Sequence, residues 1–397
     1  MSIIGIIAEF NPLHNGHKFL IDEAKKLGPV VCAISGNFVQ RGDTAIVEKR
    51  VRAEAALKCG ADLCVELPVC YSMSTAQNFA FGAVSVLAEM GCDTIMFGSE
   101  CGDVNILKKA ANILISDQFG ERLKEYLKQG ITFAVAREKA AKECGLKEDI
   151  LNFANNNLAI EYIIAALKLN KNIDFKTVTR KGASHDSKEI GEFVSASLLR
   201  EKLLEGDSEF CKEYMPLESF NLCENLSDIK RIENLILGTL RTKTKEELSA
   251  LPDISEGLEN KLYAAIKTAT SLSELYDSVK VKRYTHARIR RLVLSAFLGL
   301  NNNFFMKKPS YIRVLGFNKN GEEVIKKQSS DIPVIVKATE IEKLNDNAKE
   351  MFRFECKATD LYLLSLKNPL ACGLEYTANL IKTNINDDLI DELHSKI

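Results

Sequence analysis

The sequence lacks the features that mark several classes of protein. Its longest apolar runs, such as the one from Leu292 to Leu300, fall well short of the roughly 18 residues that suggest a membrane-spanning helix. No basic segment precedes the first apolar stretch, so we expect no signal peptide there. The formal net charge is −1, which argues against a uniformly cationic surface, so any nucleic-acid site is expected to be a local patch.

Spacings suited to disulfide or zinc motifs are also absent, although the chain has eleven cysteines. No two of them are spaced C-x-x-C, and Cys32, Cys64 and Cys92 lie inside or beside apolar runs, where cysteine packs as a small buried residue. We therefore predict reduced thiols in a cytoplasmic protein, with no structural zinc and no other protein-bound metal.

The first half of the chain alternates short apolar runs with amphipathic helical patterns. Strands are predicted at Ile3 to Ala8, Val30 to Ser35, Asp62 to Leu67, Thr94 to Phe97 and Ile173 to Thr179. Helices are predicted between them, at about 16–26, 49–59, 76–90 and 151–167. Apolar strands that alternate with helices are typical of a parallel sheet covered on both faces. The predicted fold class is therefore α/β, a Rossmann-like doubly wound sheet that binds ligands beyond the carboxyl ends of its strands.

The second half has a different pattern, and the length of 397 residues suits two or three domains. We expect a catalytic domain at 1–205 and a mainly helical region at 206–397. Residues 206–227 show no clear strand and are interpreted as a linker, helical periodicity dominates 228–300, and the tail is predicted to be helical. A small β-hairpin is predicted from Tyr311 to Phe317 and Glu322 to Ile325, because Asn320-Gly321 suits a tight turn.

The most informative segment runs from Glu9 to His17, after the first predicted strand and at the start of a helix. Backbone N–H groups and the helix dipole make such a helix start an anion site. Gly16 lets a nucleotide approach the backbone, and His14 and His17 share one face of the helix. Their imidazoles can stabilise charge on a pyrophosphate leaving group. A metal-binding pair and a simple helix cap are the alternatives, whereas a Walker loop is disfavoured because no Gly-Lys-Ser/Thr follows.

The string His14-Asn15-Gly16-His17 after a strand resembles the HxGH signature of the nucleotidyltransferase superfamily. Residues 9–17, Ser35 to Gly42 and Phe97 to Glu100 are similar to one branch, the bacterial tRNA(Met) cytidine acetate ligases. This resemblance spans most of the chain and implies an ATP-dependent ligase. Acetate and ATP would form acetyl-adenylate and pyrophosphate. The acetyl group would then pass to the N4 amine of the wobble cytidine in elongator tRNA(Met), which gives N4-acetylcytidine and AMP.

The same resemblance implies which residues bind ATP, with Mg²⁺ expected on the triphosphate. They are Ile7, Ala8, Glu9, Phe10, Asn11, Pro12, Leu13, His14, Asn15, Gly16, His17, Lys18, Phe19 and Leu20, followed by Gly102, Asn155 and Arg180. His14 and His17 would be the catalytic pair. Before Asn155 the sequence departs from the family, which tends to have proline where Ala154 stands. Glu9 is the only carboxylate that the sequence offers as a candidate ligand for Mg²⁺.

A second segment, Val194 to Arg200, resembles the serine-rich motif that covers the triphosphate in related enzymes and closes in arginine. Its candidate residues are Ser195, Ser197 and Arg200. Ala196 replaces a usual hydroxyl, and a plain helix cap at Ser195 is the alternative. His185 lies in a nearby Gly-Ala-Ser loop and is either a catalytic candidate or an ordinary loop histidine.

Basic residues concentrate between Lys280 and Arg291, where the sequence has no acidic residue. The apolar positions keep a helical period, so this segment predicts an amphipathic helix with a cationic face. The candidate tRNA contacts are Lys282, Arg283, Arg288, Arg290 and Arg291. A solvated face paired with acidic neighbours is the alternative. Asn37, Gln40 and Arg41 are candidates for the pocket that admits the cytidine.

Two other functions fit part of this pattern. A small-molecule adenylyltransferase of the same superfamily would use the same nucleotide site, but such enzymes are usually shorter. A non-catalytic RNA-binding protein on a retired nucleotide fold would have no need of His14, Gly16 and His17. The partners expected from the first function are acetate and elongator tRNA(Met), with no membrane.

Overall fold

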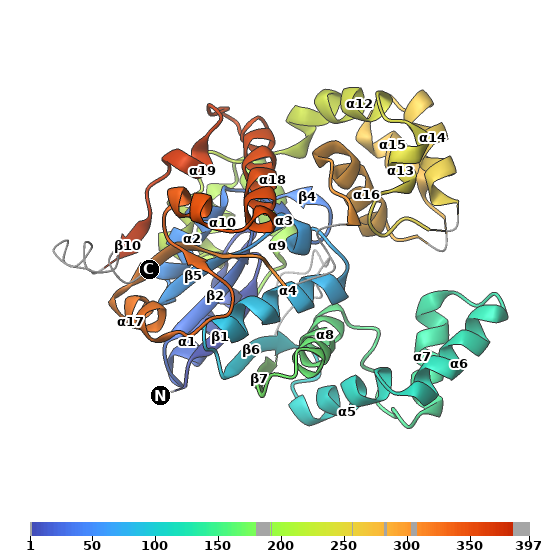
Figure 1. Cartoon of the computed structure of the whole chain (residues 1–397), viewed down its shortest axis with the longest axis horizontal. Helices are drawn as coiled ribbons and strands as arrows, with labels where there is room; N and C mark the ends of the chain where they lie inside the picture. The colour runs from blue at the N-terminus through green and yellow to red at the C-terminus, as the bar shows by residue number, and fades with distance from the viewer. Residues whose placement is uncertain are drawn as a thin grey trace.

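The computed structural model describes residues 2–179, 191, 193–255, 257–281, 284–302 and 308–383. In Figure 1 a central sheet with helices on both faces occupies the left of the molecule, a bundle of helices lies at the upper right, and a helical hairpin projects at the lower right. Within the described ranges, no helix is both long enough and apolar enough to cross a lipid bilayer. All eleven cysteines lie in those ranges and are free thiols.

Five parallel strands form the core of the sheet. They are β1 (Ile4–Ala8), β2 (Val30–Ser35), β5 (Leu63–Leu67), β6 (Thr94–Ser99) and β7 (Asp174–Thr179). Their order is β5-β2-β1-β6-β7, and each neighbouring pair runs parallel. Along β2, which is buried throughout, alternate residues pack into two separate hydrophobic clusters, one on each face. The predicted doubly wound α/β sheet is therefore confirmed.

The predicted helices follow these strands and cover both faces. On one face lie α1 (Asn15–Lys25) and α2 (Lys49–Lys58), and on the other lie α4 (Ala76–Glu89) and α8 (Ala154–Lys168). Helix α5 (Val104–Leu114) packs on α8. The projecting hairpin is α6 (Asp117–Lys128) and α7 (Phe133–Glu143) (Figure 1). The short elements β3 (Phe38–Val39) and β4 (Asp43–Thr44) pair antiparallel, and α3 (Val69–Ser72) follows β5.

Residues 206–227 are not a linker, so that prediction is wrong. Helix α9 (Ala196–Glu205) is followed at once by α10 (Ser208–Tyr214) and α11 (Leu217–Phe220). Cys211 and Met215 are buried in a cluster that includes residues of α9 and Val47. The side chain of Asp207 accepts a hydrogen bond from Phe210 N at 3.3 Å and so caps α10. The segment holds two short helices whose apolar residues are too few to show a clear period in the sequence.

Residues 228–300 are helical, as predicted. The elements are η1 (Ile229–Ile232), α12 (Glu233–Arg241), α13 (Lys245–Ser249), α14 (Leu258–Thr268), α15 (Leu272–Val279) and α16 (His286–Leu298). They form the bundle at the upper right of Figure 1. Leu240, Leu262, Leu275 and Ile289 are fully buried and belong to one hydrophobic cluster. Helix α16 also contacts β4, which brings the bundle next to the β3–β4 pair.

The β-hairpin predicted at residues 311–325 is wrong. The first strand exists as β8 (Ile312–Asn318), but α17 (Lys319–Lys327) follows it. The Oδ1 atom of Asn318 accepts hydrogen bonds from the N–H groups of Asn320 at 2.9 Å and Gly321 at 3.1 Å, so Asn318 caps a helix instead of opening a turn. A Cβ on Gly321 would lie 2.0 Å from the carbonyl oxygen of Asp62, so glycine is needed there for close packing of α17 on the sheet.

The second half of the chain also extends the central sheet. Strand β8 runs antiparallel to β5, and β9 (Val334–Ile335) and β10 (Ile381–Thr383) run parallel to β8. Between β9 and β10 in the sequence lie η3 (Ala338–Lys343), α18 (Asp346–Leu363) and α19 (Leu374–Thr377). The sheet therefore takes strands from both sides of residue 205. The division of the chain into domains at that residue stays a prediction.

A buried cluster of charged side chains fastens α18 and α19 to the sheet. Lys49 of α2 pairs with Glu66 of β5 and with Glu375 of α19. Glu355 of α18 accepts a hydrogen bond from Val69 N at 2.5 Å. Burial and the neighbouring Glu66 raise the pKa of Glu355 well above its ordinary value. Burial is the largest effect on Glu375 and would raise its pKa, but the charges of Lys49 and Arg50 and the hydrogen bonds from Lys49 and Thr359 together hold that pKa below its ordinary value.

One guanidinium ties together the ends of the two strands that carry the candidate site. Arg52 of α2 is 1% exposed. Its Nη1 donates to Glu9 O at 2.7 Å and to Ser35 O at 2.8 Å, its Nη2 to Gly36 O at 2.5 Å, and its Nε to Val47 O at 3.0 Å. Burial lowers the pKa of Arg52, yet an arginine stays protonated at neutral pH. The segment after β1 is thereby fixed to the segment after β2.

We expect Arg52→Lys to lower the free energy of unfolding by about 3 kcal/mol, because an ammonium group cannot replace the planar fork and leaves buried carbonyl oxygens unpaired. Urea denaturation measures the change. Arg241→Lys is the matched control, since that guanidinium donates to the carbonyl of Ala269, and its replacement should cost about 1 kcal/mol. Equal losses in the two variants would contradict the role of Arg52.

The raised pKa of Glu355 makes a prediction about pH. Because this carboxyl takes up a proton on folding, its contribution to the free energy of unfolding falls as pH rises above the pKa of an exposed glutamate, about 4.3. The Glu355→Gln variant lacks that proton uptake. Its free energy of unfolding minus that of the parent should therefore increase as pH rises from 5 to higher values. Urea denaturation across that pH range, with exposed Glu350→Gln on the same helix as control, tests the sign. A difference that shrinks with pH would refute it.

Candidate active site

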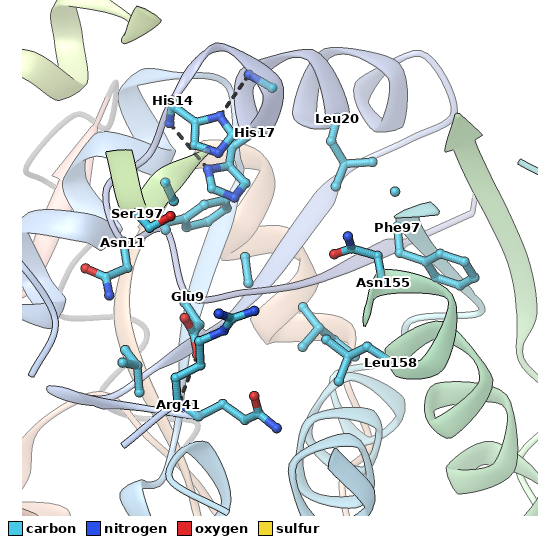
Figure 2. A pocket seen from close by; sticks show the side chains of 18 of the residues that line it. Glu9, Asn11, His14, His17, Leu20, Arg41, Phe97, Asn155, Leu158 and Ser197 are labelled. Atoms are coloured by element: carbon cyan, nitrogen blue, oxygen red, sulfur yellow. Dashed lines mark hydrogen bonds between the residues drawn. The ribbon is translucent and has the colours of Figure 1, made fainter. Parts of the chain in front are cut away.

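A cavity of about 380 Å³ lies beyond the carboxyl ends of β1, β2, β6 and β7. Eleven of the residues predicted to bind ATP line it, namely Ile7, Ala8, Glu9, Phe10, Asn11, His14, Gly16, His17, Phe19, Leu20 and Asn155. Figure 2 shows the labelled members of this wall around the cavity. Pro12, Leu13, Asn15, Lys18 and Gly102 are described but do not line it, and Arg180 lies outside the described residues.

The two predicted histidines are held together at the start of α1. His14 is the N-cap residue, and its Nδ1 accepts a hydrogen bond from Gly16 N at 3.1 Å. The Nδ1 of His17 accepts in turn from His14 N at 3.3 Å. The rings stack with centroids 3.8 Å apart and an interplanar angle of 28° (Figure 2). Because each Nδ1 is an acceptor, a neutral ring carries its proton on Nε2, which makes Nε2–H the donor group of each imidazole.

The loop between β1 and this turn is held by side-chain packing and by hydrogen bonds. Phe10 has a φ of 47°, in the left-handed region that costs a non-glycine residue free energy, and its buried ring meets His17 edge-on with centroids 5.2 Å apart. Asn11 Oδ1 accepts from Ile46 N at 2.7 Å. Arg200 Nη1 donates to Asn11 O at 2.8 Å. The packing of Phe10 and the hydrogen bonds to Asn11 hold the loop backbone in this conformation, so the strain persists.

The other side of the cavity is mainly apolar and comes from β6, β7 and α8. Phe97, Leu158 and Tyr162 line it together with Gly98, Val178 and Thr179. The carboxylate of Glu100 accepts from Asn155 N at 3.2 Å and Asn156 N at 2.8 Å, so Glu100 caps α8. The Nδ2 atom of Asn155 donates to Glu100 Oε1 at 2.6 Å. The segment Phe97 to Glu100, noted in the sequence, thus supplies both a wall residue and the carboxylate that fixes α8.

Gly102 has a structural role beside this wall. Its φ is +63°, which favours glycine, and a Cβ would lie 2.2 Å from the Oγ1 atom of Thr179. Thr179 lines the cavity, whereas Gly102 does not. The close approach that glycine permits at this position is therefore to the end of β7.

The serine-rich segment lies beside the histidine turn. Ser195 accepts a hydrogen bond from Leu198 N at 3.2 Å and caps α9, so the alternative of a helix cap holds for this residue. Ser197 and Arg200 line the cavity. Since Arg200 also donates to Asn11 O at 2.8 Å, α9 is tied to the loop that carries the histidines. His185 lies outside the described residues.

The basic helix α16 turns most of its arginines toward the protein. Arg288 Nη2 donates to Asp253 O at 2.7 Å, and Arg291 bonds Asp253 Oδ2 and Gln40 O, each at 3.2 Å. The alternative of pairing within the protein therefore holds for Arg288 and Arg291. Arg290 lines the cavity, and Lys282 and Arg283 lie outside the described residues. Contact of these five residues with tRNA stays a prediction.

Gln40 and Arg41, which the sequence offered as pocket residues, line the cavity, whereas Asn37 does not. Asn37 is buried and bonds Lys49 N at 2.8 Å. Sequence reasoning missed further wall residues: Val39, Asp43, Phe79, Tyr162, Phe193 and, among the buried supports, Arg52. Val39, Phe79 and Tyr162 are hydrophobic residues inside helices and strands, so the sequence gives no signal that separates a cavity wall from a core at these positions.

The chain resembles known proteins over nearly its whole length. Residues 1–374 match the model of the HIGH Nucleotidyl Transferase family. The chain is 41% identical over 403 residues to the tRNA(Met) cytidine acetate ligase of Thermoanaerobacter sp. strain X514, which covers 96% of this chain and 100% of that protein. It is 36% identical over 394 residues to the protein of the same name from Clostridium perfringens strain ATCC 13124, covering 93% and 96%.

Solved structures agree with these relatives. The crystal structure of apo Thermotoga maritima TmcAL is 30% identical, has a TM-score of 0.90, and covers 97% of this chain and 100% of that one. The same protein bound with α-thio ATP has a TM-score of 0.87 at the same identity and coverage. The family match and relatives of this identity over almost all of both chains lead to one conclusion. This chain belongs to the tRNA(Met) cytidine acetate ligase family of HIGH nucleotidyltransferases.

Proposed function

We propose that this chain is an ATP-dependent ligase that acetylates the wobble cytidine of elongator tRNA(Met). An acetate oxygen attacks the α-phosphorus of ATP, the bond to the β-phosphate oxygen breaks, and acetyl-adenylate and pyrophosphate form. The N4 amine of the cytidine then attacks the acetyl carbonyl carbon and loses a proton, and AMP leaves. The names of the relatives and the α-thio ATP bound to Thermotoga maritima TmcAL support this proposal.

The observation that carries the proposal is the geometry of the histidine turn. Two stacked imidazoles at the N-terminus of α1 line the cavity, and backbone N–H groups occupy both Nδ1 atoms. We infer that the Nε2–H groups donate to the phosphates, beside the positive end of the helix dipole. Negative charge grows on the pyrophosphate as it leaves, so fixed donors at this point lower the barrier without having to reorganise.

The rest of the cavity suits the remainder of the nucleotide. We propose that the loop at residues 7–20 holds the triphosphate together with Ser197 and Arg200, because a guanidinium can donate two hydrogen bonds to one phosphate. The adenosine would lie against Phe97, Leu158 and Asn155 on the opposite wall, which is mainly apolar. Gly102 would contribute by shaping Thr179. Arg180, at the end of β7 and outside the described residues, stays a candidate for a phosphate contact.

Mg²⁺ is proposed as a companion of ATP rather than as a resident of the protein. In the described part of the chain, no group of three histidine, cysteine, aspartate or glutamate side chains is placed to hold a metal ion. Glu9 lines the cavity, and one of its oxygens already accepts a hydrogen bond from Gln40 N at 2.8 Å. The cation would thus be bound mainly by phosphate oxygens and water, as is usual for Mg²⁺ with nucleotides.

Acetate-dependent exchange of pyrophosphate into ATP tests the first half of the reaction. We expect acetate to support the exchange, and we expect His17→Asn to slow it by about 100-fold, the cost of losing one donor to developing charge. His286→Asn is the matched control, because His286 is exposed on α16 and does not line the cavity. Its exchange rate should equal that of the parent chain.

The second half requires elongator tRNA(Met) and a nucleoside analysis. Incubation with ATP and acetate should produce N4-acetylcytidine at the wobble position and one AMP for each acetyl group transferred. A chain that exchanges pyrophosphate with no carboxylic acid, but adenylylates a nucleotide or phosphoester, would be a small-molecule adenylyltransferase instead. Binding of tRNA without exchange or transfer would identify a non-catalytic RNA-binding protein.

A further inference from the structure

One corner of the cavity is not explained by a bound nucleotide. Figure 2 shows Glu9 and Arg41 on one side of the cavity and Phe97, Asn155 and Leu158 on the other. The corner beside Glu9 is completed by Gln40, Asp43 and Arg290. Gln40 lies between β3 and β4, Asp43 begins β4, and Arg290 belongs to helix α16. A carboxylate at this place would repel a triphosphate. The corner therefore suits a second substrate that has both hydrogen-bond donors and hydrogen-bond acceptors.

Close packing brings Asp43 of β4 near Arg290 of α16, which belongs to the helical bundle. Gly42 has a φ of +75°, and a Cβ there would lie 2.5 Å from Arg291 N and 2.7 Å from the Cβ of Arg290. Only glycine lets the loop reach α16 this closely. Arg291 also donates to Gln40 O at 3.2 Å, which holds the loop on the helix. The position of Arg290 relative to Asp43 is thus fixed by the backbone on both sides.

Two polar groups beside this corner are buried without a partner in the described part of the chain, and of the two residues only Arg290 lines the cavity. Arg290 Nε and the hydroxyl of Tyr276 have no hydrogen-bond partner among the residues that the structure describes. The guanidinium of Arg290 lies over the Tyr276 ring, 5.6 Å from its centroid, so its plane is fixed. Buried polar groups are nearly always hydrogen-bonded, so an enclosed Nε without a partner shows that the described residues alone do not fully satisfy the Arg290 guanidinium. Burial also raises the pKa of Asp43, although Arg200 and Arg290 oppose it, which makes this carboxyl a stronger acceptor.

The donors and acceptors of this corner match one pyrimidine base. The Watson–Crick edge of cytosine has an N4–H donor followed by two acceptors, N3 and O2, whereas uracil has an acceptor, O4, and a donor, N3–H, in the first two places. A carboxylate beside a guanidinium presents an acceptor and two donors. An unstacked base in an enzyme pocket is read by hydrogen bonds to this edge, and carboxylates pair well with the N4 amine of cytosine.

We propose that Asp43 and Arg290 read the cytosine of the tRNA, with Asp43 accepting from the N4 amine and Arg290 donating to N3 and O2. This inference rests on the proposed function and adds to it the residues that select the base. It places the N4 nitrogen in the cavity that holds acetyl-adenylate. It also gives the bundle a role in substrate selection, because Arg290 comes from α16 while Asp43 comes from β4.

The test separates base reading from nucleotide binding. Arg290→Met and Asp43→Asn should leave acetate-dependent pyrophosphate exchange within about twofold of the parent, and should lower kcat/KM for acetylation of tRNA by about 10- to 100-fold. Lys267→Met, which removes a charge from an exposed position on α14 in the same bundle, should change neither rate. Loss of exchange in Arg290→Met as large as the loss of acetylation would place Arg290 on the phosphates and overturn the proposal.

Binding of altered tRNA gives a readout that a merely structural role would not change. The parent chain should bind tRNA with cytidine at the wobble position about 10-fold more tightly than tRNA with uridine there. In Arg290→Met and in Arg290→Lys, which keeps the charge but loses the fork, the ratio should fall below about twofold. A ratio that is unchanged in both variants overturns the inference. A parent chain that makes no N4-acetylcytidine overturns the proposed function, so the two failures are distinct.

Discussion

The site depends on the four hydrogen bonds that the buried guanidinium of Arg52 donates to backbone carbonyls. In a parallel sheet, neighbouring strands end at the same edge, but their following loops have no ladder to hold them in register. Arg52 supplies that link between the segments that follow β1 and β2. One of these segments carries the histidine turn, and the other carries the loop that ends in Asp43. The cavity lies between the segments that follow β1 and β2, and the hydrogen bonds from the buried Arg52 guanidinium hold these two segments together.

The proposed chemistry depends on how α1 begins. An ordinary helix start uses a serine or aspartate oxygen to accept a backbone N–H. Here an imidazole nitrogen of His14 does so, and His17 completes the reciprocal bond to the backbone of His14. The same bonds that cap the helix thus decide which nitrogen of each ring keeps its proton. In the proposed function, the bonds that cap the helix also orient the two rings toward the phosphates.

Much of this could be predicted from the sequence, and the failures have physical causes. The five parallel strands and the histidine turn have strong local signals, because buried strands are continuously apolar and the turn is compact. The Asn320-Gly321 pair misled, since the sequence does not show that the side chain of Asn318 would cap a helix. The basic helix was recognised, but Asp253 comes from a distant loop, so its pairing with Arg288 and Arg291 had no local signal. The role of Arg52 was also missed. Its partners are backbone carbonyls, which every residue has, so no residue type in the sequence marks them.

The central claim is that His14 and His17 present Nε2–H groups to the phosphates of ATP. Long-range ¹H–¹⁵N correlation spectra of the histidine side chains, recorded with and without Mg²⁺ and a non-hydrolysable ATP analogue, test it most directly. The account predicts that both rings are Nε2–H tautomers in the free protein and that the analogue shifts both sets of signals while His286 is unchanged. Protons on Nδ1, or an analogue that binds without shifting either ring, would contradict it.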